Sequence, residues 1–143
     1  MESLVDTLCS SIGSLTNPSR VKKVLKSIQH TDIDEETVSS YIGYLVDAFL
    51  FEGAKRYNIK GNKYYESLCK YYSVDVGLRN ARLNFRQQEP NHIMENVIYN
   101  ELRLRNYLVD VGVVECRKMV NGKTFASIPE WKAYIKTLPA SFP

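Results

Sequence analysis

Cysteine is scarce in this sequence: the chain has three among its 143 residues, and no two of them form a Cys-x-x-Cys pair. Cys9, Cys69 and Cys116 are odd in number and far apart, which argues against a disulfide framework or a zinc site. The N-terminus lacks a basic segment followed by an apolar run, and no stretch approaches the roughly 18 consecutive apolar residues that span a bilayer. We therefore expect a cytoplasmic protein without a membrane segment.

Excess charge is also small, because 19 basic residues nearly balance 16 acidic ones and leave a net charge of +3. This balance neither requires nor excludes a nucleic-acid partner. The distribution is uneven, however, and residues 53–90 hold a local excess of basic side chains. The basic members of this segment are Lys55, Arg56, Lys60, Lys63, Lys70, Arg79, Arg82 and Arg86, against the acidic Glu66, Asp75 and Glu89. This local positive charge is a modest indication of nucleic-acid binding.

The length suits one ordinary domain or two small ones, and the 44% hydrophobic content is sufficient for a core. Apolar residues recur at helical spacing from Leu4 to Leu15 and predict a first helix. Asn17-Pro18 is a typical helix start, and Asp34 caps a third helix. We expect the buried face of that third helix to consist of Val38, Ile42, Leu45, Val46 and Phe49. Three short helices with tight connections predict a helix-turn-helix core.

The pattern becomes extended after Leu50. Gly61-Asn62 is a turn signal between two extended segments and predicts a hairpin, so that helices and hairpin together indicate a winged helix. Tyr71, Tyr72 and Val74 predict one further strand, and Asp75 caps a helix that ends near Asn84.

Pro90 ends a polar loop and marks the predicted boundary between two units. A helix follows over residues 91–106, then a strand over 108–115, and a short helix near residues 131–136. The expected apolar side of the helix over 91–106 consists of Ile93, Met94, Val97, Ile98 and Leu102.

Three phrases resemble a known family: YIGYLVDAFLF (Tyr41–Phe51), KYYSVDVGLRN (Lys70–Asn80) and HIMENVIYNEL (His92–Leu102). With the order of elements, they make residues 4–114 similar to the C-terminal domain of a bacterial AAA+ ATPase family, a domain of unknown function. The resemblance implies a winged helix followed by part of a PD-(D/E)XK nuclease-like fold. It also implies an AAA+ ATPase domain as a partner.

The sequence departs from that family at both ends. It has no Gly-x-x-x-x-Gly-Lys-Ser/Thr loop, so we expect the ATPase half to be absent from this chain. From Cys116 onward the sequence does not match the family's continuation of the nuclease-like unit. Both departures predict a chain that is not an enzyme and that needs no cofactor.

Glu95 and Asp110 are the candidate remnant of a nuclease site. A metal-dependent nuclease needs at least two carboxylates and usually a lysine, which together hold Mg²⁺ and the water that it activates. The resemblance puts Glu95 on the first helix of such a fold and Asp110 on the next strand. Glu101 is about 240° around the helix from Glu95 and shares no face with it. No Asp…Glu-x-Lys pattern follows Asp110, so the site is predicted to be degenerate and without metal.

Basic residues outside the third helix are the candidate nucleic-acid contacts. That helix opens with Asp34, Glu35 and Glu36, which repel phosphate. The candidates are Lys22, Lys23 and Lys26 on the second helix, Lys55, Arg56, Lys60 and Lys63 in the wing, and Arg79 and Arg82 on the later helix. Binding through these residues would be independent of DNA sequence and would weaken as the salt concentration rises. The alternative is a structural or protein-interaction module.

Two readings of minor features stay open. His92 and Glu95 are one helical turn apart, as two metal ligands would be, but no third ligand is evident and a surface or capping role is the simpler reading. The ten tyrosines suit either base stacking or packing of half-buried strands.

The fold we predict is α+β and mostly helical: a winged helix over residues 1–88 and a partial nuclease-like α/β segment over 91–143. An incomplete unit exposes strand edges, so we predict a homo-oligomer formed through the C-terminal strand. Two functions remain: a non-catalytic module of an AAA+ ATPase-like protein that contacts DNA through its basic residues, or a protein-interaction or oligomerisation domain without nucleic-acid affinity. An active metal-dependent nuclease is the outsider.

Overall fold

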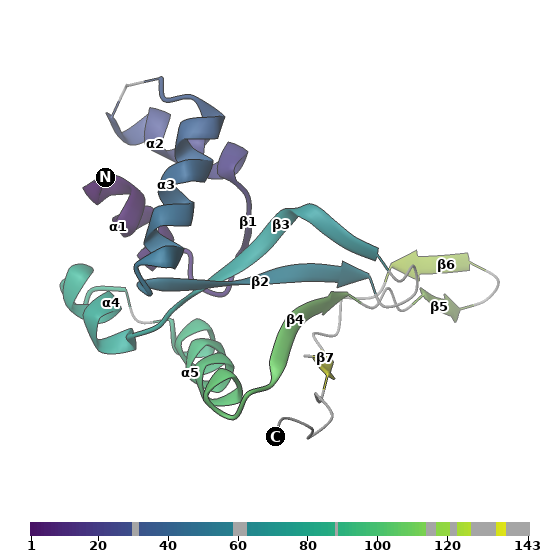
Figure 1. Ribbon diagram of the computed structural model, residues 1–143. Coiled ribbons are helices and arrows are strands. Elements are labelled where there is room, and N and C mark those ends of the chain that lie inside the picture. The colour runs from purple at the N-terminus through teal and green to yellow at the C-terminus, as the bar shows by residue number, and fades with distance from the viewer. Residues whose placement is uncertain are drawn as a thin grey trace.

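The computed structural model describes residues 1–29, 32–58, 63–87, 89–113, 117–120, 123–126 and 134–136. Helices and strands both contribute, and the predicted α+β class is confirmed. The elements are α1 (Glu2–Ser10), β1 (Leu15–Thr16), α2 (Pro18–Gln29), α3 (Glu35–Asp47), β2 (Phe51–Asn58), β3 (Lys63–Ser73), α4 (Val76–Arg82), α5 (Pro90–Leu104), β4 (Leu108–Val113), β5 (Arg117–Val120), β6 (Lys123–Ala126) and β7 (Tyr134–Lys136). Figure 1 shows α1, α2 and α3 on one side of the long β2–β3 ribbon and α5 on the other.

Local capping explains where the helices begin. The Asn17 side chain accepts a hydrogen bond from the Arg20 amide at 2.8 Å, and the Asp34 side chain accepts one from the Glu36 amide at 3.1 Å. Each bond satisfies a donor that the first turn of a helix leaves without an intrahelical partner. Both predicted helix starts are confirmed.

The first core joins the three N-terminal helices to the start of β2. Its buried members are Leu4, Leu8, Cys9, Ile12, Val21, Leu25, Val38, Ile42, Leu45 and Phe51. The expected burial of Val38, Ile42 and Leu45 is confirmed, and Val46 is half-buried. Phe49 is exposed, because the chain leaves α3 there with a φ of 56° and turns the ring away from the core.

One five-stranded sheet has the strand order β1-β3-β2-β4-β7, and β5 and β6 form a separate hairpin. β3 is antiparallel to both β1 and β2, whereas β4 is parallel to β2. Leu15 pairs with Lys70 in this sheet, so the expectation that the first helix extends to Leu15 is wrong. Tyr71 and Tyr72 are likewise not in a separate strand, because β3 continues through a register shift opposite Lys55 and Arg56.

The predicted strand after residue 107 is confirmed as β4, which pairs with β2 over Val111–Val113 and with β7 over Leu108–Asp110. Each edge of β4 is thus occupied over part of its length, which weakens the reason for expecting self-association through this strand. Residues Tyr134–Lys136 form β7 and not the expected helix. The expected turn residues Gly61 and Asn62 lie outside the described residues.

Candidate functional site

α5 lies against the sheet through polar side chains. The residues that make these contacts are Glu95, Asn96, Tyr99, Asn100 and Arg103. At 100° per residue they occupy an arc of about 140° on one side of the helix. Of the predicted apolar side, Met94, Val97 and Ile98 are exposed, whereas Ile93 and Leu102 are half-buried. The expected burial of these three residues is wrong.

Asn96 joins α5 to the end of β3. Its side chain is fully buried, its Oδ1 accepts a hydrogen bond from the Ser73 amide at 2.8 Å, and its Nδ2 donates to the Ser73 carbonyl at 2.7 Å. Asn100 donates to the same carbonyl and to that of Val74, both at 3.0 Å. Two side-chain amides thus satisfy backbone groups where β3 ends, and buried groups of this kind require such partners.

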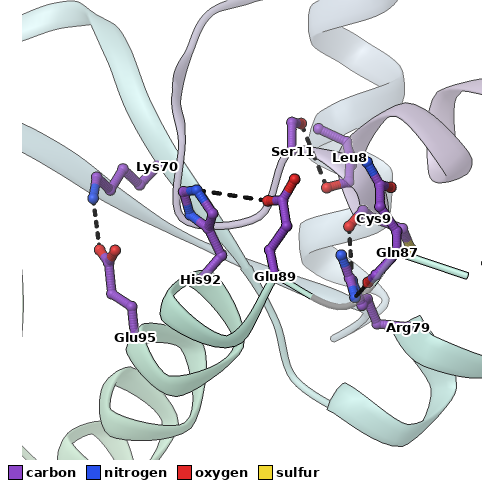
Figure 2. Close-up of polar contacts among 9 residues, drawn as sticks. All are labelled: Leu8, Cys9, Ser11, Lys70, Arg79, Gln87, Glu89, His92 and Glu95. Carbon is purple, nitrogen blue, oxygen red and sulfur yellow. Dashed lines mark hydrogen bonds and ion pairs between the residues drawn. The ribbon is translucent and has the colours of Figure 1, made fainter. Parts of the chain in front are cut away.

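Glu95, the residue before Asn96 on α5, forms a partly buried ion pair with Lys70, whose side chain is buried. The Lys70 ammonium is 2.6 Å from Oε1 of Glu95, and the Tyr72 hydroxyl donates to the same oxygen at 2.7 Å (Figure 2 draws the Lys70–Glu95 pair). Lys70 and Tyr72 are two positions apart on β3 and therefore point to the same face of the sheet. Burial, and then the Glu95 carboxylate, raise the pKa of Tyr72 far above its ordinary range, so the phenol stays protonated as a donor.

Tyr99 completes the contact between α5 and the sheet. Its ring stacks on Tyr72 with 4.1 Å between the centroids, and its hydroxyl donates to Glu52 at 3.1 Å. Arg103 donates to the same Glu52 oxygen at 2.8 Å. Tyr72 and Tyr99 form a second small core with Ala54 and Val111. Burial, and then Glu52, raise the pKa of Tyr99 as well.

His92 and Glu89 lie near the start of α5, beside the loop that follows α1 (Figure 2). The His92 Nε2 atom is 3.6 Å from Oε2 of Glu89. Gly13 approaches so closely that a Cβ at its position would be 3.0 Å from His92 Nδ1, and its φ of 68° also favours glycine. Among the described residues no group of three or more His, Cys, Asp or Glu side chains could hold a metal ion.

Glu95 and Asp110, the predicted acidic pair, both line a pocket of about 340 Å³ between α5 and the sheet. The pocket is shared, but Asp110 alternates along β4 with Val109 and Val111, which pack in the second core against α5, so its carboxylate lies on the other face of the sheet. There it accepts a hydrogen bond from the Tyr64 hydroxyl at 2.8 Å, whereas Glu95 accepts from Lys70 and Tyr72. Contacts within the chain thus engage both carboxylates.

Residues 1–89 match the family described as Domain of unknown function (DUF8612). The chain belongs to this family. The DUF8612 segment ends directly before α5, so it includes the first core, β3 and α4. An uncharacterized protein of Haemophilus influenzae is 34% identical over 119 residues, which are 83% of this chain and 30% of that relative. The chain thus spans less than a third of the relative's length. No solved structure matches.

Acidic side chains of the DUF8612 segment pair with several of the predicted nucleic-acid contacts. Lys22 and Lys26 lie 3.7 and 3.2 Å from the two carboxylate oxygens of Asp32. Arg82 donates to Asp6 at 2.6 Å and also approaches Glu2. These pairs reduce the positive potential that the sequence predicts on α2 and α4.

Arg79 is a correction to the predicted set, because only 1% of it is exposed. Its guanidinium donates to the backbone carbonyls of Cys9 and Gln87, as Figure 2 shows, and also to the side chain of Asn80. Cys9 lies in the last turn of α1, where a positive charge also complements the helix dipole. Arg79 therefore joins α4 to α1 and is not available to a phosphate.

The other predicted contacts are distributed differently. Lys23 and Lys55 are exposed, and Arg56 is half-buried in β2. Lys60 and the side chain of Lys63 lie outside what the structure describes. None of the described basic residues lies on α3.

Sequence reasoning missed Asn96 and Lys70 as structural residues. For Asn96 the sequence did hold a signal, because Glu95, Asn96, Tyr99 and Arg103 recur at the spacing of one polar helix face. The apolar side from Ile93 to Leu102 was instead predicted to be buried, since burial normally follows hydrophobicity.

Proposed function

We propose that this chain is a non-catalytic protein-interaction module of a longer protein. The observation that carries the proposal is the orientation of α5, whose polar side binds the sheet while its apolar side faces solvent. Exposed apolar patches rimmed by polar residues are typical of interaction sites. No helix in the described part of the chain is long and apolar enough to cross a membrane.

The N-terminal part is proposed to be a winged helix. The element order α1-β1-α2-α3-β2-β3 and the local strand order β1-β3-β2 support this assignment. Three helices followed by a hairpin is the arrangement that the sequence predicted. In this proposal the winged helix supports α5 and β4, since β3 contacts α5 and β2 pairs with β4.

A catalytic role for Glu95 and Asp110 is the less favoured function. A general base or metal ligand needs lone pairs directed at a substrate or ion. Here Oε1 of Glu95 accepts from two donors, and Asp110 accepts from Tyr64. The ion pair and its neighbours instead connect α5 to β3.

DNA binding is the second candidate function, because many helix-turn-helix proteins bind DNA. Exposed Lys23 and Lys55 favour it, whereas Glu35 and Glu36 at the start of α3 and the Asp32 pairs oppose it. By the resemblance described above, the longer protein would also contain an AAA+ ATPase domain. That domain is a proposed neighbour of this module.

A titration of labelled duplex DNA at two salt concentrations tests the proposal. An interaction module without nucleic-acid affinity shows no saturable change in fluorescence anisotropy at either concentration. A DNA-binding module that neutralises about six phosphates loses on the order of 10³ in affinity between about 50 and 200 mM salt. Binding with that salt dependence, weakened by Lys23→Glu and Lys55→Glu together, would overturn the proposal in favour of the DNA-binding candidate.

A further inference from the structure

β2 and β4 are paired over only part of their length. They pair from Arg56 with Val111 to Asn58 with Val113, and toward the start of each strand they diverge (Figure 1). A cavity of about 840 Å³ lies at this divergence, and we call it the β2–β4 cleft. The two strands contribute Glu52, Gly53, Lys55, Leu108, Val109 and Asp110 to its lining.

The backbone of Gly53 points into this cleft. Its cross-strand partner is Tyr71, whose carbonyl accepts a hydrogen bond from the Gly13 amide at 3.0 Å, on the side of β3 that faces β1. The backbone groups of Tyr71 thus point away from β2. In an antiparallel ladder those of its partner then point away from β3, which for Gly53 is toward β4. Among the described strands β4 alone lies on this side of β2, and it pairs only from Arg56 onward.

We propose that the β2–β4 cleft binds an extended segment of a partner protein, which adds to the edge of β2 as a short strand. Gly53 is exposed, and an accessible backbone donor and acceptor at a sheet edge bind such a segment through its own backbone. A glycine within a strand often marks a place where another backbone approaches closely. This inference rests on the proposed function and identifies the kind of partner that the interaction module binds.

The charged side chains around the cleft indicate an acidic residue in the partner. Arg103 donates to Glu52 at 2.8 Å, and Asp110 accepts from the Tyr64 hydroxyl at 2.8 Å. Lys55 is exposed and forms no ion pair with any residue that the structure describes. Its ammonium is therefore available to a carboxylate of the bound segment, and a charged hydrogen bond of this kind is stronger than a neutral one.

The end of the cleft near α3 is apolar. Val46 and Phe49 line it together with Leu108, and Phe49 and Leu108 are exposed. Residues 51–55 of β2 extend over about 13 Å, and side chains four residues apart on a strand point to the same face. The bound segment is therefore expected to carry an apolar side chain and a carboxylate four residues apart, with the carboxylate beside Lys55.

Fluorescence anisotropy of two labelled, capped peptides tests the binding. The peptides Thr-Leu-Thr-Val-Thr-Glu-Thr and Thr-Glu-Thr-Val-Thr-Leu-Thr carry the two side chains in either chain direction and favour an extended conformation. At least one is expected to bind saturably below about 1 mM. Lysine in place of its glutamate is expected to weaken binding at least threefold.

Two variants of Gly53 test whether the peptide adds to the edge of β2. Gly53→Pro removes the outward amide hydrogen but no ladder bond to β3, and it is expected to weaken peptide binding at least fivefold. Gly53→Ala is the matched control, because it keeps that hydrogen and its Cβ meets the Tyr71 ring at an ordinary 3.4 Å. Circular dichroism confirms that each variant is folded.

A charge reversal tests the contact with the carboxylate and does not depend on the proline variant. Lys55→Glu is expected to weaken the glutamate peptide at least threefold and to make the lysine peptide the tighter ligand. Lys23→Glu, at an exposed lysine on α2, is the control and should change neither affinity.

Three results would overturn the strand addition. The first is no saturable binding of either peptide up to about 1 mM. The second is binding that Gly53→Pro or Lys55→Glu leaves unchanged in a folded chain. Either result without salt-dependent DNA binding leaves the interaction module standing. The third is DNA binding with a steep salt dependence and no peptide binding, which overturns the proposed function as well.

Discussion

Replacement of Asn96 by alanine tests how α5 is held. The change removes two hydrogen bonds to Ser73, at 2.8 and 2.7 Å. The Ser73 carbonyl keeps the bond from Asn100, but the Ser73 amide loses its partner in a buried position. Two lost bonds and one unsatisfied donor correspond to about 2–4 kcal/mol, a large fraction of the roughly 5–15 kcal/mol that stabilises an ordinary domain.

Urea unfolding followed by circular dichroism measures this loss, with the dependence on urea expected to stay unchanged. Asn91→Ala is the control, because Asn91 is an exposed asparagine in the first turn of the same helix. Asn96→Asp keeps the acceptor but turns a carboxylate toward the Ser73 carbonyl, so it should be at least as damaging at neutral pH. An Asn96→Ala loss below about 0.5 kcal/mol, equal to that of Asn91→Ala, would refute the role of the amide.

Three further predictions concern the ion pair, alkaline pH and a helix cap. Glu95→Gln removes the carboxylate from a pair in which Lys70 is buried and Glu95 is 40% exposed, and should cost about 1.5–3 kcal/mol in urea unfolding, whereas replacing Lys70 and Glu95 together by methionine and leucine should cost less. The pKa of Tyr72 is raised in the folded chain, so stability is complete below the ordinary tyrosine pKa of about 10 and is lost as the pH rises above it, by about 1.4 kcal/mol per pH unit. Urea unfolding at about pH 9 and 11 should show this decline, with a smaller slope in Tyr72→Phe. Asp34→Ala removes the cap of α3 and should lower the free energy of unfolding by about 1 kcal/mol, and a change indistinguishable from zero would contradict the capping role.

Much of the N-terminal fold could be predicted, because its signals are local. Asn17, Asp34 and Asp75 are helix caps in the sequence, and each accepts a backbone hydrogen bond in the structure. The hairpin was also predicted, since a change from helical to extended pattern is visible within a few residues. Leu15 was assigned to the wrong element, because its strand exists only through pairing with Lys70, which is distant in the sequence.

The candidate site was harder to predict, because its contacts join segments that are far apart in the chain. Lys70 reaches Glu95 and Asn96 reaches Ser73 only after β3 and α5 are placed side by side. Hydrophobic periodicity found α5 correctly but predicted the wrong buried face, since it assumes that apolar residues lie inward. Arg79 was misplaced for a related reason: its burial depends on backbone carbonyls of α1 and of the segment after α4.

The central claim is that α5 turns its polar face to the sheet and its apolar face to solvent. Its most direct test compares the free energy of unfolding of Ile98→Lys and Tyr99→Ala, at protein concentrations low enough that self-association does not contribute. The structure predicts a change within about 0.5 kcal/mol for Ile98→Lys and a loss of about 3 kcal/mol or more for Tyr99→Ala. A large loss for Ile98→Lys with a small one for Tyr99→Ala would contradict this orientation of α5.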